Sequence, residues 1–157
     1  MRPVLKPALR RVWRDATTLQ LGLDPERAVV IGGLDAGAAR LVESLDGTRD
    51  VPGLLDVAEA LGVDRRRAGE LIKLLERSGV LDDAATDRRT LRQLGGPERE
   101  RLAPDLAAAS VLRRRPDGGV GVLARRRAAV IAVHGAGRIG GSVTALLAAA
   151  GVGTVVV

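Results

Sequence analysis

The sequence has no cysteine, phenylalanine or tyrosine, and it has one histidine and one tryptophan among 157 residues. Without cysteine there is no disulfide framework, thiolate metal cluster or cysteine nucleophile, and one histidine does not make a zinc site without carboxylate ligands. We therefore expect no metal site. Because aromatic side chains are nearly absent, the stacking platforms that bind single-stranded nucleic acids are missing. The core must be built from leucine, valine, isoleucine and alanine.

Charge is unevenly distributed along the chain, whose formal net charge is +6. Residues 1–105 carry 18 basic and 18 acidic side chains, whereas residues 106–157 carry seven arginines and one acidic residue, Asp117. The basic excess therefore lies entirely in the C-terminal third. No apolar segment follows the basic residues at the N-terminus, as it would in a secretory signal, so we expect a cytoplasmic protein.

Three short antiparallel strands are predicted in the first 31 residues. Leu19–Leu23 alternates leucine with small or polar residues, which is typical of a half-buried strand. Turn residues precede it at 15–16 and follow it at 24–25, where Asp-Pro favours a turn. The run Ala28–Ile31 then predicts the third strand.

Three amphipathic helices are predicted next, because apolar residues now recur with a period near 3.6. Asp64 is placed to cap the third helix, and Gly79 suits the left-handed position after its last turn. The predicted inner positions are Ala38, Leu41, Val42 and Leu45, then Leu54, Val57, Ala58 and Leu61, then Ala68, Leu71, Ile72 and Leu75. Three strands followed by three helices predict an α+β, winged-helix-like module over residues 2–84.

The second and third predicted helices also fit a helix-turn-helix, with Arg65-Arg66-Arg67 at the start of the recognition helix. A DNA-binding transcriptional regulator is therefore an alternative function. Residues 1–85, however, carry 13 basic and 14 acidic side chains, whereas phosphate binding favours a basic surface. An arginine triplet in a solvated first turn explains the same residues, so we expect no nucleic-acid partner.

The segment LVESLDGTR at 41–49, with LIKLL at 71–75 and GVL at 79–81, resembles the PqqD-like recognition element of ribosomally synthesised, post-translationally modified peptides (RiPPs). The resemblance implies a winged helix that binds the leader segment of a precursor peptide as an added strand beside its third strand and third helix. It also implies presentation of that peptide to a modifying enzyme, such as a YcaO cyclodehydratase. An exposed strand edge beside a helix suits this mode of binding.

By position, the resemblance implies a set of peptide-binding residues on the third strand and the third helix. They are Arg27, Ala28, Val29, Val30, Ile31, Arg65, Arg66, Gly69 and Lys73. These residues could equally serve only to complete the fold.

Residues 85–127 are predicted to form a connector that contains one helix and one short strand. The helix starts near Pro97 and ends before the Pro-Asp-Gly-Gly sequence at 116–119. A short strand is predicted around Val120–Leu123. The triplet Arg125–Arg127 is interpreted as the polar edge of the following strand, with binding of an anionic ligand as the alternative.

Residues 128–157 contain the strongest local motif. The apolar run Ala129–Val133 predicts a parallel strand buried on both faces, and it leads into GAGRIG at 135–140. This spacing matches the GxGxxG motif. In that motif a tight turn and the N-terminus of the following helix bind a phosphate. A helix over 139–150 and a second strand would complete a Rossmann-like βαβ. The candidate nucleotide-binding residues are Gly135, Gly137, Arg138 and Gly140; a tight turn without a ligand is the alternative.

The segments VHGAGRIG at 133–140 and LLAAAGVG at 146–153 are similar to the start of ThiF/MoeB-type, ubiquitin-activating-like adenylyltransferases. The resemblance implies ATP and Mg²⁺ as cofactors of the full domain and a place in the biosynthesis of thiazole- or oxazole-modified peptides. The sequence ends at Val157, before the family's residues for ribose, ATP and metal. We therefore expect a truncated domain that is inactive alone. The alternative is that the sequence is a fragment of an active adenylyltransferase.

Two further features of this C-terminal segment are given no functional role. His134 has no partner acid in the motif, so we do not expect it to act as a base. Residues 139–157 carry no charge, but their glycine, serine and threonine residues fit the βαβ pattern better than a membrane span. We expect no membrane partner.

Overall fold

The computed structural model describes every residue except 87 and 88, so part of the predicted connector lies outside the described residues. Contacts divide the chain into two compact units. Unit 1 contains Met1–Thr86 and Ser110–Gly118, and unit 2 contains Asp87–Ala109 and Gly119–Val157. Each unit has a hydrophobic cluster of its own.

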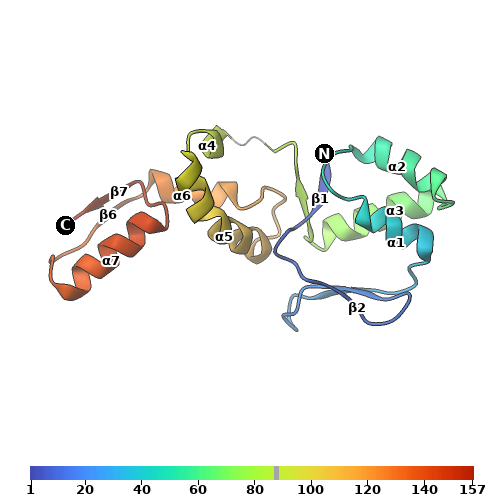
Figure 1. Cartoon of the computed structure of the whole chain (residues 1–157), viewed down its shortest axis with the longest axis horizontal. Helices are drawn as coiled ribbons and strands as arrows, with labels where there is room; N and C mark the ends of the chain where they lie inside the picture. Colours follow the sequence, from blue (N-terminus) through green and yellow to red (C-terminus); the bar gives the residue numbers. More distant parts are fainter. Residues whose placement is uncertain (87–88) are drawn as a thin grey trace. The chain divides into compact units, whose positions relative to one another are not determined.

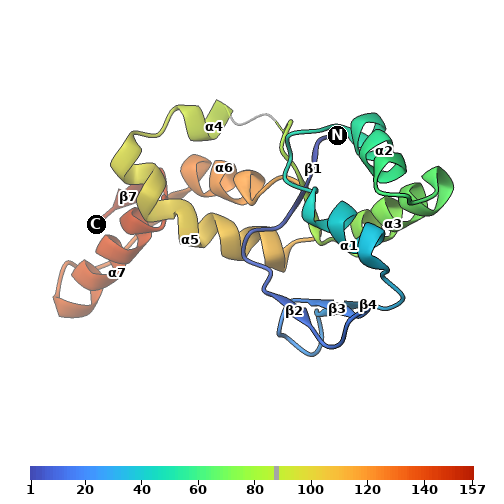
Figure 2. The same cartoon turned by 45° about the vertical axis from the view of Figure 1, so that its right-hand side comes forward.

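A three-stranded antiparallel sheet in unit 1 confirms the predicted strands (Figure 2). Strands β2 (Arg11–Trp13), β3 (Leu19–Leu21) and β4 (Val29–Ile31) pair in this order. Leu19 lies opposite Ile31, and both side chains are buried. The alternation of leucine with polar residues that predicted β3 therefore does place leucine on the core face.

A second sheet in unit 1 was not predicted from the sequence. Strand β1 (Pro3–Leu5) pairs antiparallel with β5 (Leu81–Asp83), with Leu5 opposite Leu81. Three residues are too few to show a period of two, and the partners lie far apart in the sequence. This pairing joins the N-terminus to the chain that leaves the third helix (Figure 1).

The three predicted helices are confirmed as α1 (Ala36–Glu43), α2 (Val51–Ala60) and α3 (Arg65–Arg77). Each one starts at an aspartate whose carboxylate accepts the backbone N–H three residues further on, which satisfies a free helix donor. These capping residues are Asp35, Asp50 and Asp64. Only the third of the caps was predicted.

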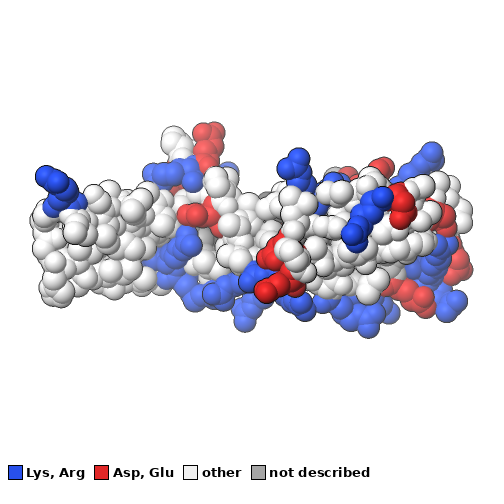
Figure 3. Space-filling view, turned by 90° about the horizontal axis from the view of Figure 1, so that it is seen from below, with Lys and Arg blue, Asp and Glu red and all other residues white. Residues whose placement is uncertain are grey.

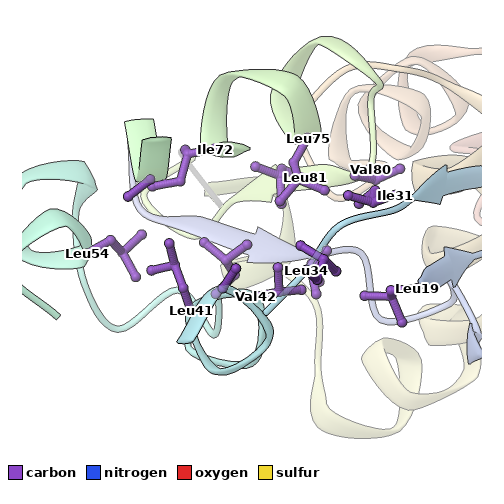
Figure 4. Close-up of a cluster of buried hydrophobic side chains, with 14 of the residues drawn as sticks. Leu19, Ile31, Leu34, Leu41, Val42, Leu54, Ile72, Leu75, Val80 and Leu81 are labelled. Carbon is purple, nitrogen blue, oxygen red and sulfur yellow. The ribbon is translucent and has the colours of Figure 1, made fainter. Parts of the chain in front are cut away.

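The core of unit 1 lies between the three-stranded sheet and the helices (Figure 4). Leucine, isoleucine, valine and alanine side chains fill it, as the composition requires. Fully or nearly fully buried members include Leu19, Leu21, Leu41, Leu45, Leu54, Ala58, Ala68 and Leu75. Most residues of the predicted apolar stripes therefore face inward, whereas Leu61 and Leu71 are partly buried at the border of the core and Val57 is not part of it.

Unit 2 begins with helices and ends in a parallel βαβ. Its elements are α4 (Arg89–Arg92), α5 (Gly96–Leu112), α6 (Val120–Ala128), β6 (Val130–Ala132), α7 (Arg138–Ala149) and β7 (Thr154–Val156). Strands β6 and β7 pair in parallel across α7. The last residues of α5, Ser110–Leu112, belong to unit 1. The predicted fold class, a winged-helix-like module followed by an incomplete Rossmann-like βαβ, is confirmed.

Three predictions for unit 2 are wrong. The residues predicted as a strand at Val120–Leu123 start α6, because Val120 and Leu123 are three residues apart and are buried on one side of a helix. The triplet Arg125–Arg127 consequently lies in the last turn of α6, not at a strand edge. Strand β6 was predicted to be buried on both faces, but Val130 is 71 % exposed because its sheet has two strands.

The βαβ presents a largely uncharged surface (Figure 3). Ile139 and Leu146 of α7 are exposed, as is Val156 of β7. None of the helices among the described residues is long and apolar enough to cross a membrane.

Candidate functional site

The hydrogen bonds of the three-stranded sheet show which backbone groups of β4 are free. In antiparallel pairs, successive residues direct their N–H and C=O groups alternately to the two sides of a strand. The N–H of Gly22 donates to the carbonyl of Arg10 at 2.8 Å, and the N–H of Arg14 donates to the carbonyl of Thr18 at 2.9 Å. The backbone N–H and C=O groups of even-numbered residues in the β3 region therefore point towards β2, and those of odd-numbered residues point towards β4.

The residues of β4 that pair with the odd-numbered Leu19 and Leu21 are Ile31 and Val29. Their backbone groups face β3, so those of Val30 face the other side. Strand β4 is the last strand of its sheet within the described part of the chain. The N–H and C=O of Val30 are therefore open to an added strand, and its side chain is 49 % exposed.

A groove with a volume of about 220 Å³ lies between the end of β4 and α3. Ile31, Leu34, Leu71 and Leu74 contribute its apolar lining, and Arg67 and Glu70 add polar groups. Leu74 is 45 % exposed although it belongs to a helix that packs on the core. We call this cavity the Leu74 groove; it offers an apolar surface directly beside the free edge of β4.

Arg67 ties the start of α3 to the end of β4. Its guanidinium donates to Asp35 at 2.6 Å and to the carbonyl of Gly33 at 3.0 Å. The backbone N–H of Ala38, and after it the side chain of Arg67, lower the pKa of Asp35 below its ordinary value. These bonds fix the two walls of the Leu74 groove at one end.

A second groove lies at the opposite ends of the same two elements. Arg27, just before β4, and Ser78, which caps the end of α3, both line a cavity of about 280 Å³. The other lining residues are Leu9, Gly79, Val80, Val111, Leu112 and Arg114. We call it the Leu112 groove. All of its lining residues belong to unit 1.

One stripe of α3 connects the two grooves. Arg67, Leu71, Leu74 and Ser78 follow at steps of four, three and four residues, which places them on one face of a helix. From 67 to 78 the helix rises about 16 Å, while β4 is extended over Val29–Ile31 and Arg27 lies in the turn before it. An extended segment of about five residues beside β4 therefore reaches from one groove to the other.

The strand residues implied by the resemblance lie along this site. Ile31 lines the Leu74 groove, and Arg27 lines the Leu112 groove. Val29 and Val30 form β4, and Ala28 lines a cavity of about 310 Å³ that shares Leu9, Arg27 and Leu112 with the second groove. Val29, Val30 and Ile31 thus form the edge strand, and Arg27 and Ala28 lie in the segment that leads into it.

The helix residues implied by the resemblance lie elsewhere. Arg65 pairs with Asp56 at 2.8 Å and with Glu59 at 3.0 Å on α2. Arg66 pairs with Glu70 at 3.2 Å along α3. These acidic partners also reduce the positive charge that a recognition helix would offer to DNA phosphates.

Gly69 and Lys73 lie outside both grooves as well. A side chain at Gly69 would point towards Leu55 of α2, and Lys73 is exposed. The groove is instead lined by Arg67, Glu70, Leu71 and Leu74, which the sequence reasoning missed. One feature of the sequence could have indicated this groove: Leu74 is apolar but lies just outside the inward-facing stripe of α3.

In unit 2, the glycine turn between β6 and α7 has the backbone that the motif requires. Gly135 has φ +103°, which favours glycine, and a Cβ at Gly140 would clash with the carbonyl oxygen of Gly135. At Gly137, no described atom lies within 4 Å of the position of a Cβ.

The start of α7 is open to an anion. Gly137 caps it without a side-chain hydrogen bond, Arg138 is exposed at its first position, and its first turn has no acidic residue. Free N–H groups at such an end fit the phosphate part of a nucleotide. No group of three potential metal ligands occurs among the described residues. The chain thus supplies groups that fit phosphate, but no metal-binding cluster in the part described.

The fold is a winged-helix-like module followed by a parallel βαβ with a glycine turn between β6 and α7. Solved structures share this arrangement: PaaA matches with a TM-score of 0.72, at 18 % identity over 96 % of this chain and 44 % of that protein. E. coli MccB, in its structure with ATP, matches with a TM-score of 0.67, at 13 % identity over 98 % of this chain and 41 % of MccB.

These likenesses concern the fold. The chain spans less than half the length of these solved structures. Searches with protein-family models and among curated proteins find no match.

Proposed function

We propose that unit 1 binds the leader segment of a ribosomally synthesised precursor peptide and presents it to a modifying enzyme, such as a YcaO cyclodehydratase. The leader adds as a strand to β4 and lays side chains against α3. The observation that carries this proposal is the open N–H and C=O of Val30 beside the Leu74 groove. Main-chain hydrogen bonds would supply affinity, and the grooves would supply selectivity.

The β4 edge is tested by removing one donor. Peptides are first selected from a random library of about ten residues against the full chain, a length that exceeds the span of β4. In Val30→Pro the N–H that faces the added strand is lost, while the bonds of Val29 and Ile31 to β3 remain. We expect the affinity for selected peptides, measured by fluorescence anisotropy, to fall at least about tenfold.

Ala36→Pro is the matched control for this substitution. Ala36 occupies the first position of α1, where proline is tolerated because that N–H has no partner within the helix. It does not line either groove, so peptide affinity should stay unchanged. Equal affinity of Val30→Pro and the unmodified chain would refute strand addition to β4.

For unit 2, we propose that the GxGxxG turn belongs to a ThiF-like domain that binds ATP, with Mg²⁺, in a longer protein. Gly135, Gly137 and Gly140 would hold the phosphates close to the start of α7, and Arg138 would add a positive charge. The fold that this chain shares with MccB, whose structure contains ATP, supports the proposal.

A further inference from the structure

The Leu112 groove differs from the Leu74 groove in its charge. Arg27 and Arg114 line it, and Arg10 lines the adjoining cavity together with Arg27. Asp24 is the acidic residue of this lining. This end of the site therefore has an excess of positive charge, whereas the Leu74 groove contains Glu70 as well as Arg67, and Arg67 hydrogen-bonds to Asp35 at 2.6 Å.

The two arginines of the Leu112 groove are available to a ligand. Arg114 has no carboxylate partner among the described residues, and its stem lies over Gly79, within 2.7 Å of where a Cβ would be. This packing holds the side chain across the end of α3. Arg27 pairs with Asp24 at 3.6 Å, but both side chains are about half exposed, and such pairs contribute little.

Apolar side chains accompany these charges. Leu112 is 63 % exposed, and Leu9 packs at the border of the core. A glutamate or aspartate side chain matches this combination, because its methylene groups can contact leucine while its carboxylate pairs with a guanidinium.

We propose that the peptide bound along β4 carries an acidic side chain that enters the Leu112 groove, about four residues from the apolar side chain that fills the Leu74 groove. An even spacing places both side chains on one face of an extended segment, and both grooves contain residues of the same α3 stripe. This inference rests on the proposed strand addition to β4 and specifies which peptides the site accepts.

The test uses the selected peptides described above, synthesised with amidated C-termini so that side chains supply the carboxylates. We expect selection to enrich an acidic residue four positions from an apolar one. Replacing that acid by its amide should weaken binding to the full chain at least about tenfold. When the chain carries Arg114→Gln or Arg27→Gln, replacing the peptide's acid by its amide should reduce affinity less. Arg77→Gln removes one charge from α3 outside the grooves, so in this variant the acid-to-amide replacement should still cause the full loss of affinity.

Each outcome decides one of the two proposals. If peptides bind and Val30→Pro weakens them, but the acid-to-amide replacement changes nothing, strand addition stands and the acidic specificity is refuted. If the effect of the acid is equal in Arg27→Gln, Arg114→Gln and the unmodified chain, the assigned groove is wrong. If a peptide with a free C-terminus and no acidic side chain binds with the same affinity, the groove binds a terminal carboxylate instead, and the proposed side-chain specificity is wrong. If no peptide binds, both proposals fail together.

Discussion

Lys6 is a cation enclosed in unit 1, with 1 % of its surface exposed. Its ammonium group donates to the carbonyls of Ser110 at 2.5 Å and Arg113 at 2.8 Å, and it lies 3.9 Å from Asp82. Burial lowers the pKa of Lys6, and the charge of Asp82 opposes this shift. Lys6, which directly follows β1, thereby holds the end of α5 and the segment after it.

Lys6→Met should destabilise the chain strongly. The substitution keeps most of the apolar volume but leaves two carbonyls and the Asp82 carboxylate without their cation, which costs about 3–5 kcal/mol. Urea unfolding followed by circular dichroism measures the loss. Lys73→Met, on an exposed position of α3, should change stability by less than about 0.5 kcal/mol, and equal effects of the two substitutions would contradict the role given to Lys6.

Asp35 links stability to acid pH. Its pKa is lowered in the fold by the N–H of Ala38 and by Arg67, so its contribution is fully present above the ordinary value of 3.8. That contribution is lost as the pH falls through the lowered folded value. Asp35→Asn keeps a capping side chain but removes the titration. We expect melting curves of Asp35→Asn and the unmodified chain to converge under strong acid; a constant difference would contradict this linkage.

At the scale of elements, the helices of unit 1 were predictable because their apolar period is long enough to recognise. Ala68, Ile72 and Leu75 could be placed on the core side of α3 from the sequence alone. The three-residue β1 and β5 could not, because their pairing depends on contacts between residues far apart in the chain. Val120–Leu123 was predicted as a strand because it is a short apolar segment with two valines after a turn, whereas Val120 and Leu123 are buried on one side of α6.

The face of α3 that lines the two grooves shows the same limit. Its core side follows from periodicity, but which exposed neighbours face β4 depends on how the helix is rotated against the sheet. The bond from Arg67 to Gly33 sets that rotation, and it joins residues 34 positions apart. The resemblance therefore implied residues of the edge strand, but on the helix it implied exposed positions such as Arg66 and Lys73, which lie outside the grooves.

Leu74→Glu tests the groove at the level of α3. A carboxylate in the Leu74 groove would be desolvated by a bound apolar side chain, so peptide affinity should fall at least about tenfold. Because Leu74 is 45 % exposed, folding should be little affected. Lys73→Glu places the same charge one residue away, outside the groove, and should retain binding; similar losses for both would show that charge, not the groove, controls affinity.

In the whole chain, the winged-helix-like unit with the free β4 edge is followed by a parallel βαβ with a GxGxxG turn. The two units have separate cores. A substitution in one unit should therefore leave the folding of the other unit intact, so that peptide binding and nucleotide binding can be tested separately. The order of elements shared with PaaA and MccB follows the chain almost from end to end.

Gly137→Val tests the nucleotide proposal. Gly137 has an ordinary φ of −67° and open space around it, so valine should be accommodated without strain. The added methyl groups would occupy the position where a phosphate approaches the start of α7, so any binding of a fluorescent ATP analogue should be lost. Gly141→Ala, where a Cβ meets ordinary contacts, is the control. Binding that persists in Gly137→Val would refute the phosphate site.

The central claim is that a peptide pairs with the outer edge of β4. The hydrogen-exchange rate of the Val30 amide measures this pairing directly. In the free chain the Val30 amide should exchange much faster than those of Val29 and Ile31, which already face β3. A selected peptide should slow Val30 strongly and change its two neighbours little. Saturating peptide that leaves Val30 exchange unchanged, while slowing amides elsewhere, would contradict the account.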